Sequence, residues 1–271
     1  MTKDYTVIKP ISELNKKDIL GILDHTFLKT SDEYGDEQKR KIDFEKFLSD
    51  VCSAEDKPYG ICVRAYDVKQ SFGMLKSNGL EKEIKIASVV GFHTGLDSTD
   101  DKLGEMDRAI NDGATEIDAV VNYSLFKKRV NEGKGLIYDF WRNLIFAQTI
   151  EERVEEEIFK LSHIASDNRV FLKLILETGE LNQEEIVKLC GFAKKYGVDM
   201  VKTSTGYSKI GATIDAVKTM RENFPWGIKI SGGVKKENLS ELLSAMEFFS
   251  GGWIHLDPKK VRIGSSKMFY D

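Results

Sequence analysis

Histidine and cysteine, the residues that most often hold metal ions and disulfides, are scarce in this chain. It has four histidines, and none lies three or four residues from another, so their spacing gives no zinc-type cluster. The three cysteines, Cys52, Cys62 and Cys190, show no CxxC spacing and cannot all pair, which fits a reducing cytoplasm. We therefore expect a cytoplasmic protein whose chemistry needs no metal ion and no cofactor.

Long apolar runs, charge imbalance and low-complexity tracts are missing as well. The longest apolar stretches are strand-sized, far short of the roughly 20 residues that cross a bilayer. The N-terminal stretch MTKDYTVIKPISELNKKD lacks the apolar core of a signal peptide. A net charge of -4 arises from 40 basic and 44 acidic residues spread along the chain, and the basic run at 127–129 is short. These features argue against membrane insertion and against nucleic-acid binding.

Short β-rich runs alternate with helical stretches along the whole chain. Their enrichment in Val and Ile, over lengths of about five to eight residues, is typical of buried strands. The runs lie at 21–28, 59–65, 84–92, 116–123, 170–179, 199–206, 227–234 and 252–256. Eight strands alternating with helices predict a single (β/α)8 barrel domain over residues 1–271. The alternative is a doubly wound open sheet, but the GxGxxG turn common in such folds does not follow the first run.

Charged and polar residues gather near the C-terminal ends of these predicted strands, where barrels of this kind carry their catalytic groups. They are Asp24, Asp118, Asn122, Lys173, Glu177, Lys202 and Lys229. Buried charges are costly unless they are paired, so a structural ion-pair network explains any one of them alone. Because they come from different strands at similar depth, the whole set favours an active site.

Lys202 and Lys229 form the sharpest pair, since each lies in an apolar run that ends in small residues. Two ammonium groups in a site of low dielectric constant repel each other, and burial adds to the effect. At least one of the two is therefore expected to have a lowered pKa. A neutral lysine is a nucleophile that forms a Schiff base with a carbonyl group, and a carboxylate such as Asp118 can move the protons.

Small residues follow the last three predicted strands, as TSTG at 203–206, SGG at 231–233 and GSS at 264–266. Such residues leave backbone N–H groups open to an anion, and barrels often bind phosphate at these loops. The three segments together predict a phosphorylated substrate.

These motifs, in this order, resemble the deoxyribose-phosphate aldolase family of class I aldolases. The shared stretches are LDHTFLK (23–29), GICVRA (60–65), VVGFHTG (89–95), GATEIDAVVNY (113–123), LKLILETGEL (172–181), VKTSTGY (201–207), IKISGGV (228–234) and IGSS (263–266). The resemblance implies a (β/α)8 barrel. It also implies reversible cleavage of 2-deoxy-D-ribose 5-phosphate to D-glyceraldehyde 3-phosphate and acetaldehyde through a lysine Schiff base, with a small sugar phosphate as the partner.

The resemblance further implies a role for each matching residue. Lys202 corresponds to the Schiff-base lysine, Lys229 to the second lysine that perturbs it, and Asp118 to the acid/base carboxylate. Asp24 corresponds to an aspartate in the proton network beneath the second lysine, and Lys173 to a supporting charge. The positions that match substrate and phosphate binding are Thr203, Gly206, Gly232, Gly233, Gly264, Ser265 and Ser266.

Two departures from the family pattern keep alternatives open. His93 stands where family members commonly carry proline, and Lys235 stands where an arginine often follows the SGGV-type turn. Both would permit a Schiff-base aldolase of the same fold with a different aldehyde acceptor. A barrel that binds a sugar phosphate without catalysis is the second alternative.

Three segments are expected to depart from a plain barrel. Residues 1–20 form an N-terminal extension, with a helix over 11–20 that closes the barrel bottom. Residues 126–159 enlarge the fourth connection, as a surface elaboration or as a contact in a homo-oligomer such as a dimer. After residue 266 only KMFYD remains, so the C-terminal helix is expected to be shortened, with Tyr270 packed rather than catalytic.

Overall fold

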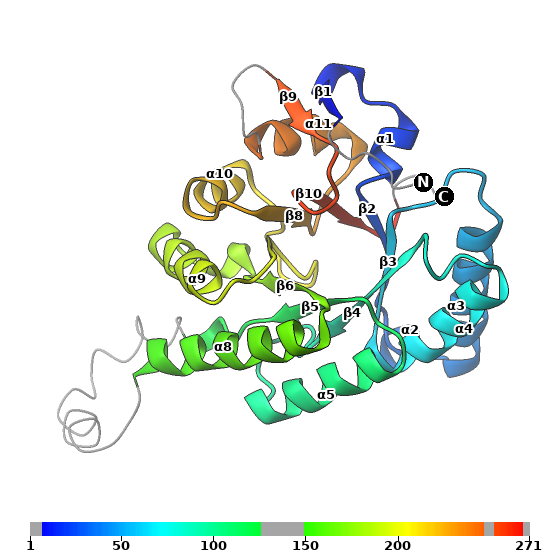
Figure 1. Cartoon of the computed structure of the whole chain (residues 1–271), viewed down its shortest axis with the longest axis horizontal. Coiled ribbons are helices and arrows are strands. Elements are labelled where there is room, and N and C mark those ends of the chain that lie inside the picture. The colour runs from blue at the N-terminus through cyan, green and yellow to red at the C-terminus, as the bar shows by residue number, and fades with distance from the viewer. Residues whose placement is uncertain (1–6, 126–148, 247–251, 268–271) are drawn as a thin grey trace.

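A closed barrel of eight parallel strands forms the centre of the molecule (Figure 1). The computed structural model describes residues 7–125, 149–246 and 252–267. The strands follow one another around the barrel in the order β10-β2-β3-β4-β5-β6-β7-β8. Their bounds are β2 (Leu23–Phe27), β3 (Gly60–Val63), β4 (Lys85–Val90), β5 (Glu116–Val120), β6 (Phe171–Ile175), β7 (Met200–Lys202), β8 (Gly227–Ser231) and β10 (Val261–Ser265). The predicted (β/α)8 barrel is confirmed.

Helices connect the strands and cover the outside of the barrel (Figure 1). The longer ones are α3 (Glu37–Ser53), α4 (Val68–Ser77), α5 (Thr99–Asn111), α8 (Ile150–Asn168), α9 (Gln183–Lys195), α10 (Ile214–Asn223) and α11 (Lys236–Ala245). Side-chain caps start several of them: Thr149 and Asn182 each accept a hydrogen bond from the backbone N–H of a glutamate three residues later. In α9 the buried face consists of Ile186, Leu189, Cys190 and Ala193, as helical spacing predicts.

The apolar core lies mainly between the strands and the helices, while charges occupy much of the barrel interior. In β5, Ile117 and Ala119 belong to the large apolar cluster, whereas Glu116 and Asp118 make ion pairs with side chains of other barrel strands. Alternation along a strand places residues two apart on the same face. The side chains of Ile117 and Ala119 therefore face the helices, and those of Glu116 and Asp118 face the barrel axis.

The prediction that residues 252–256 form the eighth barrel strand is wrong. They contain β9 (Trp253–His255), which pairs antiparallel with β1 (Ile8–Pro10) in a separate two-stranded sheet. Trp253 is 46% exposed, so only Ile254 of this strand is buried. The eighth barrel strand is β10, which carries a charged residue, Arg262, between two apolar ones and therefore does not look like a buried strand in the sequence.

The N-terminal segment before β2 is broken rather than continuous. A 3₁₀ turn, η1 (Ile11–Glu13), is followed by α1 (Lys16–Leu20). Asn15 separates them because it caps α1: its side chain accepts a hydrogen bond from the N–H of Asp18, whose carboxylate accepts one from the N–H of Asn15. The predicted helix over 11–20 is thus only its second half, and η1 packs against α11 (Figure 1).

The predictions for the enlarged fourth connection and for the C-terminus fall partly outside the described residues. Residues 126–148 of the long fourth connection and Tyr270 are not among them, whereas 150–159 form the first part of α8. In the described part of the chain, which ends at residue 267, no helix follows β10. Within the same residues, no helix is both long and apolar enough to cross a bilayer.

Candidate active site

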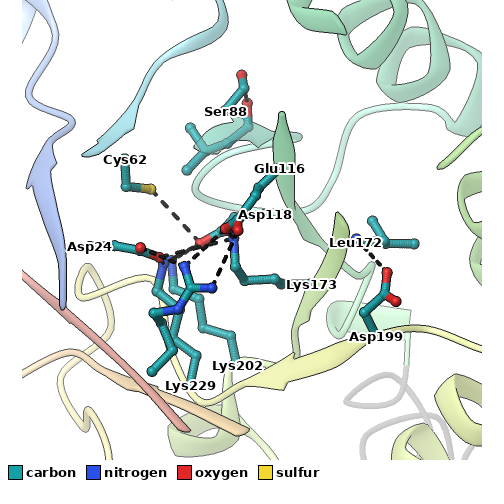
Figure 2. A network of polar contacts seen from close by, with 12 residues as sticks. Asp24, Cys62, Ser88, Glu116, Asp118, Leu172, Lys173, Asp199, Lys202 and Lys229 are labelled. Carbon is teal, nitrogen blue, oxygen red and sulfur yellow. Dashed lines mark hydrogen bonds and ion pairs between the residues drawn. The ribbon is translucent and has the colours of Figure 1, made fainter. Parts of the chain in front are cut away.

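Seven charged side chains from six barrel strands are joined by ion pairs inside the barrel, and Figure 2 labels six of them. They are Asp24 on β2, Glu116 and Asp118 on β5, Lys173 on β6, Lys202 on β7, Lys229 on β8 and Arg262 on β10. None of them is more than 3% exposed. We call this set the charge cluster. It contains all four residues predicted to be catalytic, together with Lys173 and two that were not predicted.

Asp118 is the centre of the charge cluster (Figure 2). Its Oδ2 accepts hydrogen bonds from Lys202 Nζ at 2.9 Å and from Lys229 Nζ at 2.8 Å. Its Oδ1 accepts one from Lys173 Nζ at 2.7 Å. The strand register brings these groups together, since Asp118 lies opposite Lys173 and Lys202 lies opposite Lys229 on neighbouring strands.

A second layer of ion pairs lies beneath this centre. Arg262 Nη1 is 2.7 Å from Asp24 Oδ1 and 2.9 Å from Glu116 Oε2. Lys173 Nζ is 2.6 Å from Glu116 Oε2, and Lys229 Nζ is 2.5 Å from Asp24 Oδ2. Every carboxylate of the cluster therefore contacts at least two cations.

The sequence analysis missed Glu116 and Arg262. The signal for Glu116 was its place two residues before Asp118, because strand alternation puts both on the inner face. Arg262 was missed because the eighth strand was predicted at 252–256, whereas Arg262 lies in β10. Of the other polar residues noted near strand ends, Asn122 donates its backbone N–H to Glu157 and Glu177 accepts hydrogen bonds from Thr205, so neither joins the charge cluster.

The ion pairs decide the protonation of the carboxylates. Burial alone would raise the pKa of Asp118, but Lys173, Lys202 and Lys229 outweigh it and hold this pKa well below its usual range. Burial is likewise outweighed at Asp24, where Arg262 and Lys229 lower the pKa to about 2. Both groups are therefore carboxylates throughout the neutral range.

The cations of the second layer are held charged. Burial on its own would lower the pKa of Lys229, but Asp118 and Asp24 outweigh it and the pKa is raised. Repulsion between two lysines predicts a lowered pKa, and at Lys229 the structure gives the opposite because two carboxylates contact it. Asp118 and Glu116 raise the pKa of Lys173 in the same way, against the effect of burial.

Lys202 differs from the other two lysines of the charge cluster. It is the last residue of β7, at the C-terminal end of the barrel, and among the described residues Asp118 is the one carboxylate within ion-pair distance of it. Lys173 and Lys229 each contact two carboxylates at 2.8 Å or less. Of these three lysines, Lys202 is therefore the one that ends its strand and the one with the fewest ion pairs.

The glycines predicted to bind phosphate come together after β7 and β8. Gly206, Gly232 and Gly233 all have positive φ angles, of 91°, 80° and 71°. A Cβ on Gly206 would lie 3.7 Å from the Cα of Gly232, so the two turns touch. Left-handed turns of this kind aim successive backbone N–H groups outward, as anion sites require.

The hydroxyl residues predicted for the substrate lie close to these turns but differ in their contacts. Thr203 Oγ1 donates to the carbonyl of Ser231 at 2.9 Å and accepts from its N–H at 3.0 Å, so it ties β7 to β8. Ser265 ends β10, paired with His25, and Ser266 is exposed just beyond it. Thr203 is thus engaged in the scaffold, while the two serines lie at the rim.

Gly264 lies on β10 beside Lys229 rather than in a loop. A Cβ at this position would lie 3.0 Å from Lys229 Cε and 3.1 Å from the Cβ of Ser231. Real Cβ contacts are rarely this short, so the absence of a side chain makes room for the lysine.

Replacing Gly264 by alanine is expected to displace Lys229 and lower kcat about 10-fold. A group that takes part in catalysis must be held to within about 0.5 Å, and a misplacement of about 1 Å can lower the rate about 10²-fold. Gly73→Ala is the matched control, since nothing lies within 4 Å of a Cβ at that position on α4. Steady-state kinetics on both variants gives the comparison. Equal kcat values would mean that Gly264 does not set the position of Lys229.

The two residues that depart from the family pattern lie outside the charge cluster. The ring of His93 stacks on Tyr207, with centroids 4.2 Å apart and an interplanar angle of 11°, and Phe92 meets Tyr207 edge-on. Lys235 is exposed and caps α11, with its backbone N–H donated to Asn238. His93 and Tyr207 thus link the segment after β4 to the turn after β7.

A cavity of about 650 Å³ opens at the other end of the barrel, where the strands begin. Tyr59, Lys85, Arg169 and Lys259 are among the residues that line it, and Glu116 is the one member of the charge cluster that it reaches. Lys202 lies at the opposite end, where β7 ends, so we place the candidate active site at the charge cluster and not at this cavity. In residues 7–125, 149–246 and 252–267, no group of three or more His, Cys, Asp or Glu side chains could hold a metal ion.

Comparison with known proteins identifies relatives over most of the chain. No protein-family model matches it. The deoxyribose-phosphate aldolase of Thermococcus kodakarensis is 32% identical over 235 residues, which are 86% of this chain and 91% of the relative. That of a Thermoanaerobacter species is 34% identical over 224 residues, 80% of this chain and 84% of the relative.

Solved structures agree with these relatives. A Coccidioides immitis protein provisionally named deoxyribose-phosphate aldolase superposes with a TM-score of 0.67 at 26% identity, covering 93% of this chain and 83% of that one. The tetrameric deoxyribose phosphate aldolase of Aeropyrum pernix has a TM-score of 0.67 at 20% identity, covering 95% and 91% of the two chains, and supports the fold alone.

Proposed function

This chain belongs to the deoxyribose-phosphate aldolase family and is therefore a lyase, and from this premise we propose its reaction. It cleaves 2-deoxy-D-ribose 5-phosphate reversibly to D-glyceraldehyde 3-phosphate and acetaldehyde. Lys202 forms a Schiff base with the aldehyde carbon of the open-chain sugar. The observation that carries the proposal is the place of Lys202: a buried lysine at a strand's C-terminal end, paired with a single carboxylate.

The proposed reaction begins with attack of neutral Lys202 Nζ on C1 of the sugar. The carbinolamine that forms loses water to give the imine. Transfer of the proton of the C3 hydroxyl to the Asp118 carboxylate then allows the C2–C3 bond to break, with its electrons taken up by the iminium group as an enamine. Glyceraldehyde 3-phosphate leaves, the enamine is protonated at C2, and water releases acetaldehyde from the lysine.

Asp118 and Lys229 serve this reaction through their contacts with Lys202. Asp118 Oδ2 accepts hydrogen bonds from both amines, so it is placed to receive or return a proton at Lys202 Nζ. Lys229, charged and held by Asp24 and Asp118, contributes a positive charge beside the reacting nitrogen. Such a neighbour disfavours a second ammonium group at Lys202.

The phosphate of the substrate is proposed to bind at the turns after β7, β8 and β10. Gly206, Gly232 and Gly233 would present backbone N–H groups, and Ser265 and Ser266 hydroxyl and backbone donors. We also propose a cytoplasmic homo-oligomer, such as a dimer. The three free cysteines suit a reducing compartment, and the family member from Aeropyrum pernix is described as tetrameric.

Borohydride trapping followed by peptide mass mapping tests the proposed chemistry. We expect an adduct on Lys202 with acetaldehyde and with deoxyribose 5-phosphate, because both present a carbonyl to the same amine. An adduct with acetaldehyde alone would keep the lysine chemistry and assign another aldehyde acceptor. The absence of any lysine adduct would refute the Schiff base and favour a barrel that binds sugar phosphates without catalysis.

A further inference from the structure

The charge cluster contains unequal numbers of opposite charges. Four of its members can carry a positive charge, namely Lys173, Lys202, Lys229 and Arg262, and three a negative one, namely Asp24, Glu116 and Asp118. With all seven ionised, one positive charge has no counterpart within the cluster, none of whose members is more than 3% exposed. An uncompensated buried charge is costly. The cluster is therefore balanced when one cation is neutral.

The contacts decide which cation gives up its proton. A guanidinium group keeps its charge in proteins, and Arg262 contacts both Asp24 and Glu116. Lys173 and Lys229 each contact two carboxylates as well. Within the part of the chain that the structure describes, Lys202 makes an ion pair with Asp118 alone and shares that carboxylate with the other two lysines. Loss of the proton from Lys202 thus breaks the fewest ion pairs.

Arg262 is fixed from several sides at the far end of the cluster. Its Nε donates to the carbonyl of Pro258 at 2.8 Å, and its guanidinium lies 4.0 Å from the ring centroid of Tyr59. Its ion pairs are with Asp24 and Glu116, whereas the ion-pair partner of Lys202 is Asp118. Any effect of Arg262 on Lys202 must pass through the carboxylates that it occupies.

We infer that Arg262 is a positioning residue that sets the charge balance of the cluster, so that Lys202 is the amine left neutral for the reaction. Arg262 neutralises Asp24 and Glu116 in part, which leaves the three lysines to share the remaining negative charge. Without this arginine, three carboxylates would face three lysines and the ammonium form of Lys202 would be compensated. The inference rests on the proposed function, because it takes Lys202 to be the reacting amine.

Among the described residues, the charged groups that contact Lys202 or its partner Asp118 belong to this count. Asp118 comes from β5 and Lys229 from β8, and both contact it directly or through a shared oxygen. From β3, the Cys62 thiol lies 3.8 Å from Asp118 Oδ2, and burial together with Asp118 raises its pKa, so it adds no charge at neutral pH. Lys173 on β6 and Asp24 on β2 complete the surroundings.

The test measures the pH dependence of acetaldehyde trapping at Lys202 in the full-length enzyme. In Arg262→Gln the cluster is balanced with Lys202 protonated, so we expect the lower limb of the profile to move up by about one pH unit, a roughly tenfold loss below it. Arg262→Lys should restore much of the profile because it keeps the charge. Trapping at high pH should reach the same plateau in all three proteins.

Glu116→Gln provides the opposite sign. Removing a carboxylate raises the positive excess from one charge to two, so the lower limb should move to lower pH. If Arg262 and Glu116 only supported the fold, both variants would lose activity without their pH profiles moving in opposite directions. The matched control is Arg40→Gln, which breaks another buried arginine–carboxylate pair, Arg40–Asp67, outside the cluster and should leave the profile unchanged.

The outcomes separate this inference from the proposed function. If wild-type Lys202 is trapped but Arg262→Gln and Glu116→Gln keep the wild-type profile, or shift it in the same direction, the charge-balance inference is wrong and the Schiff base stands. If wild-type Lys202 is not trapped at any pH, the proposed function itself fails. Should one variant not fold, the other still gives a shift of predicted sign.

Discussion

Lys202→Met removes trapping by borohydride and lowers the rate of carbon–carbon cleavage by at least about 10³-fold, because no other lysine takes over as the nucleophile. The fold should survive, since Asp118 keeps Lys173 and Lys229 as partners and methionine fills the space with apolar atoms. Removing one partner of a buried ion pair is costly when it leaves the other charge unpaired, but Asp118 stays paired with two lysines here. We therefore expect the free energy of unfolding to change by about 1 kcal/mol or less, measured by urea denaturation.

A second buried lysine offers the matched control for this variant. Lys102 on α5 is fully buried, pairs with Glu157 at 2.8 Å and donates to the backbone carbonyl of Val120, and neither Lys102 nor Glu157 is a member of the charge cluster. The double variant Lys102→Met with Glu157→Gln should retain trapping and turnover, whatever its stability. Near-normal cleavage by Lys202→Met, or loss of cleavage in the control as well, would contradict the assignment of Lys202.

Asp118→Asn is expected to separate trapping from turnover. An amide keeps the size of the side chain but cannot take up protons, and loss of a positioned acid–base group costs about 10²- to 10⁴-fold in rate. Lys202 should still form an imine with acetaldehyde, because losing a carboxylate from the cluster favours a neutral lysine. Quench-flow trapping compared with kcat measures the two effects.

The same variant should be markedly less stable. Asp118 contacts three lysines, and breaking a buried pair by removing one partner costs about 3–5 kcal/mol. Asp67→Asn, which removes the carboxylate facing Arg40, is the control for stability loss without loss of turnover. An Asp118→Asn enzyme with wild-type kcat would exclude this residue from proton transfer.

Much of the fold was predictable because the first seven barrel strands alternate with amphipathic helices in regular order. The lysines and aspartates of the predicted site were recognisable because a charge inside an apolar run has few structural explanations. The eighth strand could not be located from the sequence. The segment Trp253–His255 has a more strand-like composition than Val261–Ser265, which is the strand that closes the barrel. The two segments differ in the strands with which they pair, β1 for the first and β2 and β8 for the second, and a local sequence pattern does not reveal this pairing.

The protonation of the lysines in the charge cluster could not be predicted from the sequence either. Two lysines near each other predict repulsion, but the outcome depends on how many carboxylates each one contacts. Glu116 and Arg262 enter that count only once the strands are placed around the barrel. Gly264 likewise resembles part of a phosphate loop in the sequence, whereas in the structure it lies in β10 opposite Ser231, next to the side chain of Lys229.

The closure of the barrel by β10 has a consequence for how the enzyme acquires activity. Arg262 is 238 residues away from its partner Asp24, and Lys229 is 205 residues away from the same aspartate. Contacts so distant along the chain form late, because the intervening loop must first lose its entropy. A chain emerging from the ribosome holds Lys202 long before the arginine that balances it has been synthesised. Catalytic competence should therefore appear only when the last strand docks, so that activity reports completion of the barrel.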